Sequence, residues 1–268
     1  MDTDKVFRGS IPALYDEYLV PMFFAPYARD MAARVAVLRP HRVLETAAGT
    51  GIVTRALAAA LPGEATIEAT DLSQPMLDQA ARHPSPASIS WRQADAQALP
   101  FPDAGFDAVV CQFGVMFFPD RAKAFAEAHR VLKPGGRFLF SVWDRIEAND
   151  FADVVLKAVT VMFPDNPLVF CARIPHGLYD TARLTTELQA AGFTDVSVEA
   201  VALESEAPDA LAVALGLCQG TPMRHEIETR DASRLGEATD AAAAAVAARF
   251  GAGAVNGQLR AFILTATR

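Results

Sequence analysis

The sequence has few cysteines, and none of them stands close to another. Cys111, Cys171 and Cys218 are far apart in a chain of 268 residues, with no Cys-x-x-Cys pair. This spacing argues against a disulfide framework and against a zinc site. It predicts reduced, buried thiols and no bound metal.

Positive charge is also in deficit. The chain holds 24 Lys and Arg against 32 Asp and Glu, its formal net charge is −8, and its pI is about 5.1. Such a chain offers no overall basic field to hold a polyphosphate backbone. We therefore expect no nucleic acid partner.

Long hydrophobic runs are missing as well. Hydrophobic residues make up 51% of the chain, yet no uninterrupted run approaches the length that a bilayer requires. The opening residues, MDTDKVFRGS, carry two acids and no apolar core, unlike a secretion signal. These features predict a soluble, cytoplasmic protein with no membrane partner.

The sequence does contain a regular alternation of short β-rich runs and helical patterns between residues 42 and 143. This alternation predicts a parallel sheet with helices on both faces. The expected fold is α/β, a doubly wound and mostly parallel seven-stranded sheet. Strands are expected at 42–45, 66–70, 89–92, 106–111 and 137–143, with two later strands at 196–203 and 260–266.

Helices are expected between most of these strands. They should cover 51–61, a segment that begins after Ser73, and 120–132, which ends at the KPGG turn of residues 133–136. Beyond the fifth strand, helices are expected at 151–163 and 181–191, and the alanine run 241–245 favours plain helix.

A loop of small residues follows the first strand, in the stretch VLETAAGTG. Gly49 and Gly51 lack a Cβ, so a ligand can approach the main chain closely, and Ala47 is nearly as small. The loop opens into a helix, whose free N–H groups favour a carboxylate or phosphate. In a doubly wound sheet, ligands bind where this loop faces the end of the fourth strand, here the segment 111–114.

Acidic residues at the strand ends indicate the kind of ligand. Asp71 directly follows the second strand, where a carboxylate can accept hydrogen bonds from both hydroxyls of a ribose. Asp95 follows the third strand and can reach an adenine edge, so the two acids imply adenosine. Glu45 would repel a pyrophosphate but suits an ammonium group. S-adenosylmethionine carries both adenosine and an ammonium.

Four motifs then occur in a specific order: VLETAAGTG, ATDLSQPML, QADAQALPFPDAGFDAVVCQFG and RVLKPGGR. Together they resemble the class I S-adenosylmethionine-dependent methyltransferases, in the branch that acts mostly on small molecules. The resemblance is close over residues 38–143 and loose over the late strands. It implies a Rossmann-like methyltransferase fold, S-adenosylmethionine as cofactor, and methyl transfer to a small organic acceptor.

The same resemblance implies a set of cofactor contacts. Ala47 stands where the family usually has the first glycine of the loop, and its methyl group would narrow the pocket slightly. The implied contacts are Glu45, Ala47, Gly49 and Gly51 in the loop, Asp71 on the ribose, Leu72 or Met76 on the adenine face, Asp95 and Ala96 at the adenine edge, and Gln112 and Phe113 beside the methionine portion.

The segment before the first strand is rich in aromatic residues. Two interpretations of Tyr15 and Tyr18 stay open: they belong to a helix packed on the body, or they form a lid over the cofactor's sulfonium or over the acceptor, since aromatic faces attract cations. We count both as candidate cofactor contacts. We divide the chain into an N-terminal helical lid segment at 1–41, a cofactor-binding core at 42–145, and a remainder at 146–268 with a cap at 164–180 and a helical insertion at 206–257.

No catalytic residue can be named from the sequence. His176 and His225 lie in the loosely patterned second half, where either could face the acceptor. The fourth strand is followed by CQFG rather than an Asn/Asp-Pro-Pro-Tyr motif, and no Pro-Cys nucleophile is present. Two alternatives remain: a nicotinamide-dependent oxidoreductase, against which Glu45 and Thr54 argue, and a protein that binds S-adenosylmethionine without catalysis.

Overall fold

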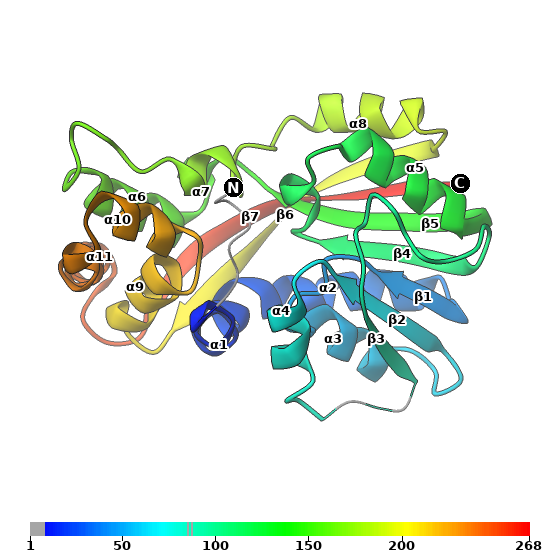
Figure 1. Ribbon diagram of the computed structural model, residues 1–268, viewed down its shortest axis with the longest axis horizontal. Helices are drawn as coiled ribbons and strands as arrows, with labels where there is room; N and C mark the ends of the chain where they lie inside the picture. The colour runs from blue at the N-terminus through cyan, green and yellow to red at the C-terminus, as the bar shows by residue number, and fades with distance from the viewer. Residues whose placement is uncertain (1–8, 85, 87) are drawn as a thin grey trace. The chain divides into compact units, whose positions relative to one another are not determined.

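A computed structural model describes residues 9–84, 86 and 88–268. The described residues form a seven-stranded sheet with the strand order β3-β2-β1-β4-β5-β7-β6 (Figure 1). This confirms the expected α/β fold with a mostly parallel sheet. The strands are β1 (Arg42–Glu45), β2 (Thr66–Asp71), β3 (Ile89–Gln93), β4 (Phe106–Gln112), β5 (Leu132–Trp143), β6 (Thr194–Ala207) and β7 (Val255–Thr267).

The centre of the sheet is parallel. β1 pairs in parallel with β2 on one side and with β4 on the other, and β2–β3 and β4–β5 are parallel as well. Residues Ala108, Val109 and Val110 of β4 are fully buried, as expected for a strand with helices over both faces. The carboxyl ends of β1, β2, β3 and β4 therefore lie at the same edge of the sheet.

β5 differs from the prediction. It begins at Leu132 rather than at residue 137, because the KPGG segment lies within the strand instead of forming a turn before it. Phe106 pairs with Leu132 and Ala108 with Arg137, so four residues of β5 bulge out of register. Gly135 has a φ of +77° in this bulge, a conformation that glycine adopts without strain.

The helices agree with the expected segments to within a few residues. Asp120 and Asp180 cap two of them by accepting hydrogen bonds from Lys123 N and Arg183 N at 3.0 Å each. The helices are α1 (Ile11–Leu14), α2 (Ala25–Val37), α3 (Ile52–Ala60), α4 (Gln74–Ala80), α5 (Arg121–Val131), α6 (Asp150–Thr160), α7 (Phe170–Arg173), α8 (Thr181–Ala190), α9 (Ala210–Gln219), α10 (Met223–Asp231) and α11 (Leu235–Phe250), with short 3₁₀ turns at Val115–Phe117, Ile146–Ala148 and Ala232–Arg234.

The aromatic N-terminal segment forms an unusual helix. Residues Tyr15–Phe24 make a π-helix, labelled η2, between α1 and α2. Pro21 lies inside it, and a proline removes the N–H that an α-helix would need at that position. Wide π turns of this kind are rare and often occur at functional sites. Residues 1–8 of the expected lid segment lie outside the described residues.

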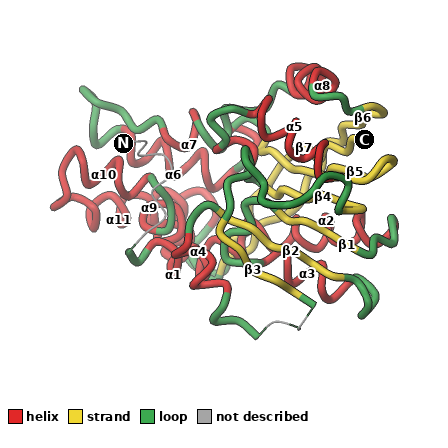
Figure 2. The backbone as a smooth tube through the Cα atoms, turned by 45° about the vertical axis from the view of Figure 1, so that its right-hand side comes forward, coloured by secondary structure: helices red, strands yellow, loops and turns green. Residues whose placement is uncertain are grey.

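The chain divides into two compact units. The helical unit comprises the described part of Met1–Pro26 together with Trp143–Leu178 and Ala202–Arg260. The sheet unit comprises Tyr27–Val142, Tyr179–Val201 and Ala261–Arg268. In the sheet unit, α5 and α8 cover one face of the sheet, and α2 and α3 lie on the other face (Figures 1 and 2).

Within the helical unit, η2 packs closely on α9. A Cβ added to Gly216 of α9 would lie 3.0 Å from Met22 Cε and 3.2 Å from Tyr18 Cβ, so the glycine allows this approach. Ser205 Oγ also donates a hydrogen bond to Met22 O at 2.9 Å. Across the described part of the chain, no helix combines the length and the apolar character needed to cross a membrane.

Candidate functional site

The small-residue loop between β1 and α3 is tied to the strands on both sides of β1. Thr46 N donates to Val110 O of β4, and Ala48 N donates to Thr70 O of β2, each at 2.9 Å. Within the loop, φ is +53° at Ala47, +58° at Gly49 and +83° at Gly51. The loop therefore has a defined backbone with left-handed residues at alternate positions.

Ala47 adopts the left-handed conformation although it is not a glycine. A Cβ added to Gly114, just after β4, would lie 2.5 Å from Ala47 Cβ and 2.7 Å from Cys111 Sγ. Gly114 thus provides the space that the Ala47 methyl group fills. The departure from the family's usual glycine is accommodated at the end of β4.

Glycine is suited to the two loop positions, 49 and 51, for different structural reasons. A Cβ added to Gly51 would lie 2.4 Å from Trp91 Cη2, so Gly51 makes room for the Trp91 ring of β3. At Gly49 the nearest described atom to such a Cβ is Met76 Cε, at 3.5 Å. The main chain at Gly49 is therefore the part of the loop with space beside it, and the structure places Met76 there as well. Leu72, in contrast, is 55% exposed.

Asp71 links this loop to the end of β2. Its Oδ2 accepts a hydrogen bond from Gly49 N at 2.8 Å, and its Oδ1 accepts one from Ser73 N at 2.7 Å. Each carboxylate oxygen can accept two hydrogen bonds, so the bound amides leave acceptor capacity for a ribose. Burial raises the pKa of the Asp71 carboxyl, and the backbone N–H bonds partly offset this shift.

Glu45 is buried at the end of β1. Thr54 Oγ1 donates a 2.5 Å hydrogen bond to Glu45 Oε2, and Thr70 Oγ1 donates to the Glu45 backbone oxygen at 2.9 Å. Burial, only partly offset by the bond from Thr54, raises the pKa of Glu45 to about 8. At neutral pH the carboxyl is therefore mainly protonated in the free protein, which weakens the expectation that its charge would repel a pyrophosphate.

Asp95 organises the turn after β3. Its Oδ1 accepts hydrogen bonds from Gln97 N at 2.8 Å and from Gln97 Nε2 at 3.0 Å. Ala94 N donates to Asp71 O at 3.0 Å, which brings the ends of β2 and β3 together. Ala96, the next candidate contact, is half-buried in this turn.

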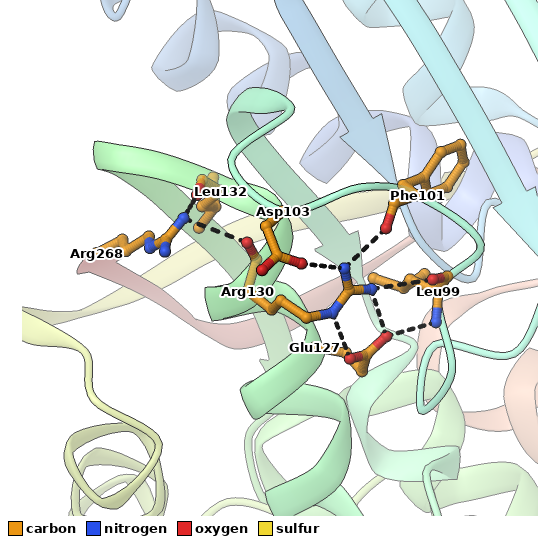
Figure 3. A network of polar contacts seen from close by, with 7 residues as sticks. All are labelled: Leu99, Phe101, Asp103, Glu127, Arg130, Leu132 and Arg268. Atoms are coloured by element: carbon orange, nitrogen blue, oxygen red, sulfur yellow. Dashed lines mark hydrogen bonds and ion pairs between the residues drawn. The ribbon is translucent and has the colours of Figure 1, made fainter.

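An arginine fixes the continuation of the same turn (Figure 3). The Arg130 guanidinium donates to Leu99 O, Phe101 O and Asp103 Oδ1, and it forms two bonds to the Glu127 carboxylate. Glu127 Oε2 also accepts Leu99 N at 2.7 Å. The bidentate pair anchors the segment that leads from Asp95 toward β4.

Gln112 and Phe113 end β4 in a buried position. Phe113 has a φ of +53°. Its backbone N donates hydrogen bonds to Ser141 Oγ at 3.1 Å and to Ser141 O of β5 at 3.2 Å. The Phe113 ring meets Tyr27 edge to face, with 5.3 Å between centroids. This strained backbone turns the chain at the end of β4.

Tyr15 and Tyr18 belong to the helical unit. The Tyr15 ring stacks on Phe24 with 5.0 Å between centroids, and both tyrosines are half-buried. The pKa of Tyr18 is raised, first by its hydrogen bond with Glu17. The lid interpretation of these two residues stays a prediction.

Sequence reasoning missed three contributors to the site. Thr54 and Thr70 hold Glu45, and Trp91 packs on Gly51; the pattern identified Trp91 and Thr70 only as strand residues. In the ranges 9–84, 86 and 88–268, no three side chains of His, Cys, Asp or Glu gather in a way that could hold a metal ion.

The fold and the loop together define a Rossmann-like methyltransferase fold. The structure is similar to that of a putative methyltransferase from Bacillus halodurans, with 21% identity and a TM-score of 0.55 over 89% of this chain and 97% of the other. It is also similar to phosphoethanolamine N-methyltransferase 2 of Haemonchus contortus, in complex with S-adenosyl-L-methionine, with 18% identity and a TM-score of 0.60 over 99% and 58% of the chains. At sequence identities of 21% and 18%, the similarity to these two structures shows the fold alone.

The sequence comparison identifies the family of the domain. Residues 44–140 match the model of a methyltransferase domain family. The chain is 44% identical over 114 residues to demethylmenaquinone methyltransferase of Thermus thermophilus, covering 42% of this chain and 50% of that protein. It is 35% identical over 132 residues to the ubiquinone/menaquinone biosynthesis C-methyltransferase UbiE of Marinomonas, covering 48% and 53%. Residues 44–140 therefore carry a methyltransferase domain, and the matches span about half the length of these relatives.

Proposed function

We propose that this protein transfers a methyl group from S-adenosylmethionine to a small organic acceptor. The observation that carries the proposal is the 2.8 Å hydrogen bond from Gly49 N to Asp71 Oδ2. It joins an acid suited to a ribose with the one loop glycine that has space beside its main chain. The family match of residues 44–140 supports the same assignment.

The small-residue loop and the two acids Asp71 and Asp95 would bind opposite ends of the cofactor. Asp71 would accept the ribose hydroxyls, and Asp95 and Ala96 would lie at the adenine edge, with Met76 or Leu72 on the ring face. Ala47, Gly49 and Gly51 would face the amino acid portion. Glu45 would accept its ammonium group once the carboxyl ionises, and Gln112 and Phe113 would flank the methionine chain.

Positioning would supply most of the rate. Methyl transfer is an in-line displacement, so the acceptor atom has to lie behind the methyl carbon while water is excluded. Holding two reactants in such a geometry can lower a barrier by roughly 7 to 11 kcal/mol. The buried, hydrogen-bonded backbone around Ala47 and Phe113 suits this task because it does not need to reorganise.

The acceptor cannot be taken over from the relatives. The names of these relatives refer to menaquinone and ubiquinone, but the matched segments cover less than half of this chain. We therefore carry over only a small-molecule acceptor. We also propose that the protein acts in the cytoplasm. Its net charge of −8 supports the proposal that it binds no nucleic acid, because it offers no overall basic field to a phosphate backbone.

Turnover with a metabolite panel tests the proposal. The protein is incubated with S-adenosylmethionine and the panel, and release of S-adenosylhomocysteine is measured by mass spectrometry. We expect release that depends on one class of acceptor. Binding of S-adenosylmethionine without any turnover would favour the non-catalytic alternative, and oxidation of a substrate with a nicotinamide cofactor would favour the oxidoreductase.

A further inference from the structure

The turn after β3 contains a glutamine that is not among the candidate cofactor contacts. Gln97 lies two residues beyond Asp95, and both residues are half-buried rather than sealed in the core. Gln97 and its hydrogen-bond partners Asp95 and Asp120 all belong to the segment Tyr27–Val142 of the sheet unit. The contacts of Gln97 therefore lie within one compact unit.

Gln97 holds one oxygen of the Asp95 carboxylate with two donors. Gln97 N donates to Asp95 Oδ1 at 2.8 Å, and Gln97 Nε2 donates to the same oxygen at 3.0 Å. A carboxylate oxygen accepts about two hydrogen bonds, so these two fill Oδ1. Oδ2 has one longer contact, 3.2 Å from Gln97 Nε2, and no further hydrogen bond from the described residues. Oδ2 is therefore the oxygen with capacity left for a ligand.

The orientation of the Gln97 amide is fixed from its other side. Asp120 N donates to Gln97 Oε1 at 2.9 Å. A backbone N–H only donates, so the amide oxygen has to face Asp120 and the amide nitrogen has to face Asp95. Asp120 in turn caps α5 by accepting a hydrogen bond from Lys123 N at 3.0 Å. Gln97 thus connects the Asp95 carboxylate to the start of α5.

The turn that carries Asp95 has a second anchor on α5. Leu99 N donates to Glu127 Oε2 at 2.7 Å, and Leu99 O accepts a hydrogen bond from the Arg130 guanidinium (Figure 3). α5 therefore holds the turn at two points, through Gln97 and through Leu99. Supporting contacts of this kind fix the direction in which a binding group points.

This arrangement has a chemical consequence for a purine beside Asp95. A carboxylate oxygen offers only lone pairs, so Oδ2 requires a donor on the ligand. The 6-amino group of adenine is a donor. The 6-oxo group of hypoxanthine is an acceptor, and it would leave two acceptors facing each other without a proton between them.

We propose that Gln97 is a positioning residue of the cofactor site: its amide holds Asp95 Oδ1, so that Oδ2 faces the ligand and the site selects a 6-amino purine over a 6-oxo purine. The inference rests on the proposed function and specifies how the cofactor's base is recognised. Gln97 acts through Asp95 and makes no contact with the cofactor itself.

The test compares the binding of S-adenosylhomocysteine and S-inosylhomocysteine by calorimetry. The wild type should bind the adenosyl compound about 10- to 100-fold more tightly, because the inosyl compound leaves Oδ2 unpaired. Gln97→Glu keeps an oxygen for Asp120 N but replaces the donor to Asp95 by a second carboxylate, and Gln97→Met removes both contacts. In both variants the two compounds should bind within about threefold of each other.

Gln74→Glu is the matched control. Gln74 Nε2 donates to Asp78 Oδ1 at 2.7 Å on the exposed surface of α4, so this change adds the same charge beside an aspartate. It should keep the wild-type ratio of the two affinities. The pair of Gln97 variants excludes a purely structural role: if only the contact with Asp120 mattered, Gln97→Met would be impaired and Gln97→Glu would keep the wild-type ratio.

A further variant tests the direction of Asp95 with Gln97 left intact. In Asp95→Asn, both Gln97 donors require the oxygen of the new amide, so its NH₂ group has to take the place of Oδ2. A donor then faces the base, and the preference for the adenosyl compound should fall by at least about tenfold. An Asp95→Asn protein that keeps the wild-type preference would contradict the proposed orientation.

Two other results overturn the inference while leaving the proposed function intact. These results are equal binding of the two compounds by the wild type, and a wild-type ratio of affinities in Gln97→Glu. Failure of the wild type to bind either compound would instead contradict the proposed function itself.

Discussion

The sheet unit and the helical unit present their chemistry in different ways. In the sheet unit, the candidate contacts come from short motifs at successive strand ends, and the hydrogen bond from Gly49 N to Asp71 Oδ2 joins two of them. In the helical unit, Tyr15, Trp143 and His176 come from distant parts of the sequence. Local motifs therefore identify the candidate cofactor contacts, whereas the contacts among these distant residues emerge only from the folded chain.

The largest expected effect concerns Asp71. Asp71→Ala removes a charged acceptor for the ribose and also releases Gly49 N and Ser73 N, so S-adenosylmethionine should bind about 2 to 4 kcal/mol more weakly. Isothermal titration calorimetry measures this loss. Asp78→Ala, on the exposed surface of α4, is the control and should bind normally. Unchanged affinity of Asp71→Ala would remove the main support for the cofactor site.

The next effect concerns Gly51 and tests whether the loop is held by packing. Gly51→Ala places a methyl group 2.4 Å from Trp91 Cη2 at a φ of +83°, so we expect a loss of about 2 to 3 kcal/mol in the free energy of unfolding. Urea denaturation measures it. Gly63→Ala has open space around its Cβ and should change stability by less than about 1 kcal/mol. Equal effects of the two changes would contradict the role given to Trp91.

A smaller effect is expected for the contact between Ala47 and Gly114. Gly114→Ala should lower the free energy of unfolding by about 1 to 3 kcal/mol because its methyl group meets Ala47 Cβ and Cys111 Sγ. Combining it with Ala47→Gly should recover about 1 kcal/mol, since only the contact with Cys111 remains. A double-mutant cycle in urea measures the coupling. Purely additive changes would show that the two residues do not share this space.

The smallest effect is a pH dependence at Glu45. Its pKa is about 8 in the free protein, so below that pH the proton has to leave when an ammonium group binds. Affinity for S-adenosylmethionine should therefore rise with pH between about 6 and about 7.5, by at most about tenfold per pH unit. Dissociation constants measured over this range should show a flat profile for Glu45→Gln. A flat wild-type profile would disprove the role of Glu45.

Much of the sheet follows from the sequence because short β-rich runs alternate regularly with helical patterns between residues 42 and 143. β1, β2, β3 and β4 end within one residue of their predicted limits. The start of β5 was missed because KPGG has the composition of a turn, and nothing local shows that it pairs as a bulge. β6 extends beyond its predicted limits because most of its side chains are exposed and leave no hydrophobic pattern.

The candidate site likewise has residues that the sequence predicts and contacts that only the structure shows. Spacing identified Gly49 and Asp71, but no spacing links Trp91 to Gly51 or Thr54 to Glu45, since those contacts depend on how side chains meet across strands and helices. From the sequence alone, His176 and His225 were equal candidates to face the acceptor. Burial and the bond to Asp144 distinguish His176, and both result from tertiary packing.

The most direct test of the cofactor assignment is a calorimetric titration of the wild-type protein with S-adenosylmethionine and, separately, with NADH. We predict a saturable signal with S-adenosylmethionine and none with NADH at the same concentrations. Tight binding of NADH without any binding of S-adenosylmethionine would contradict the account.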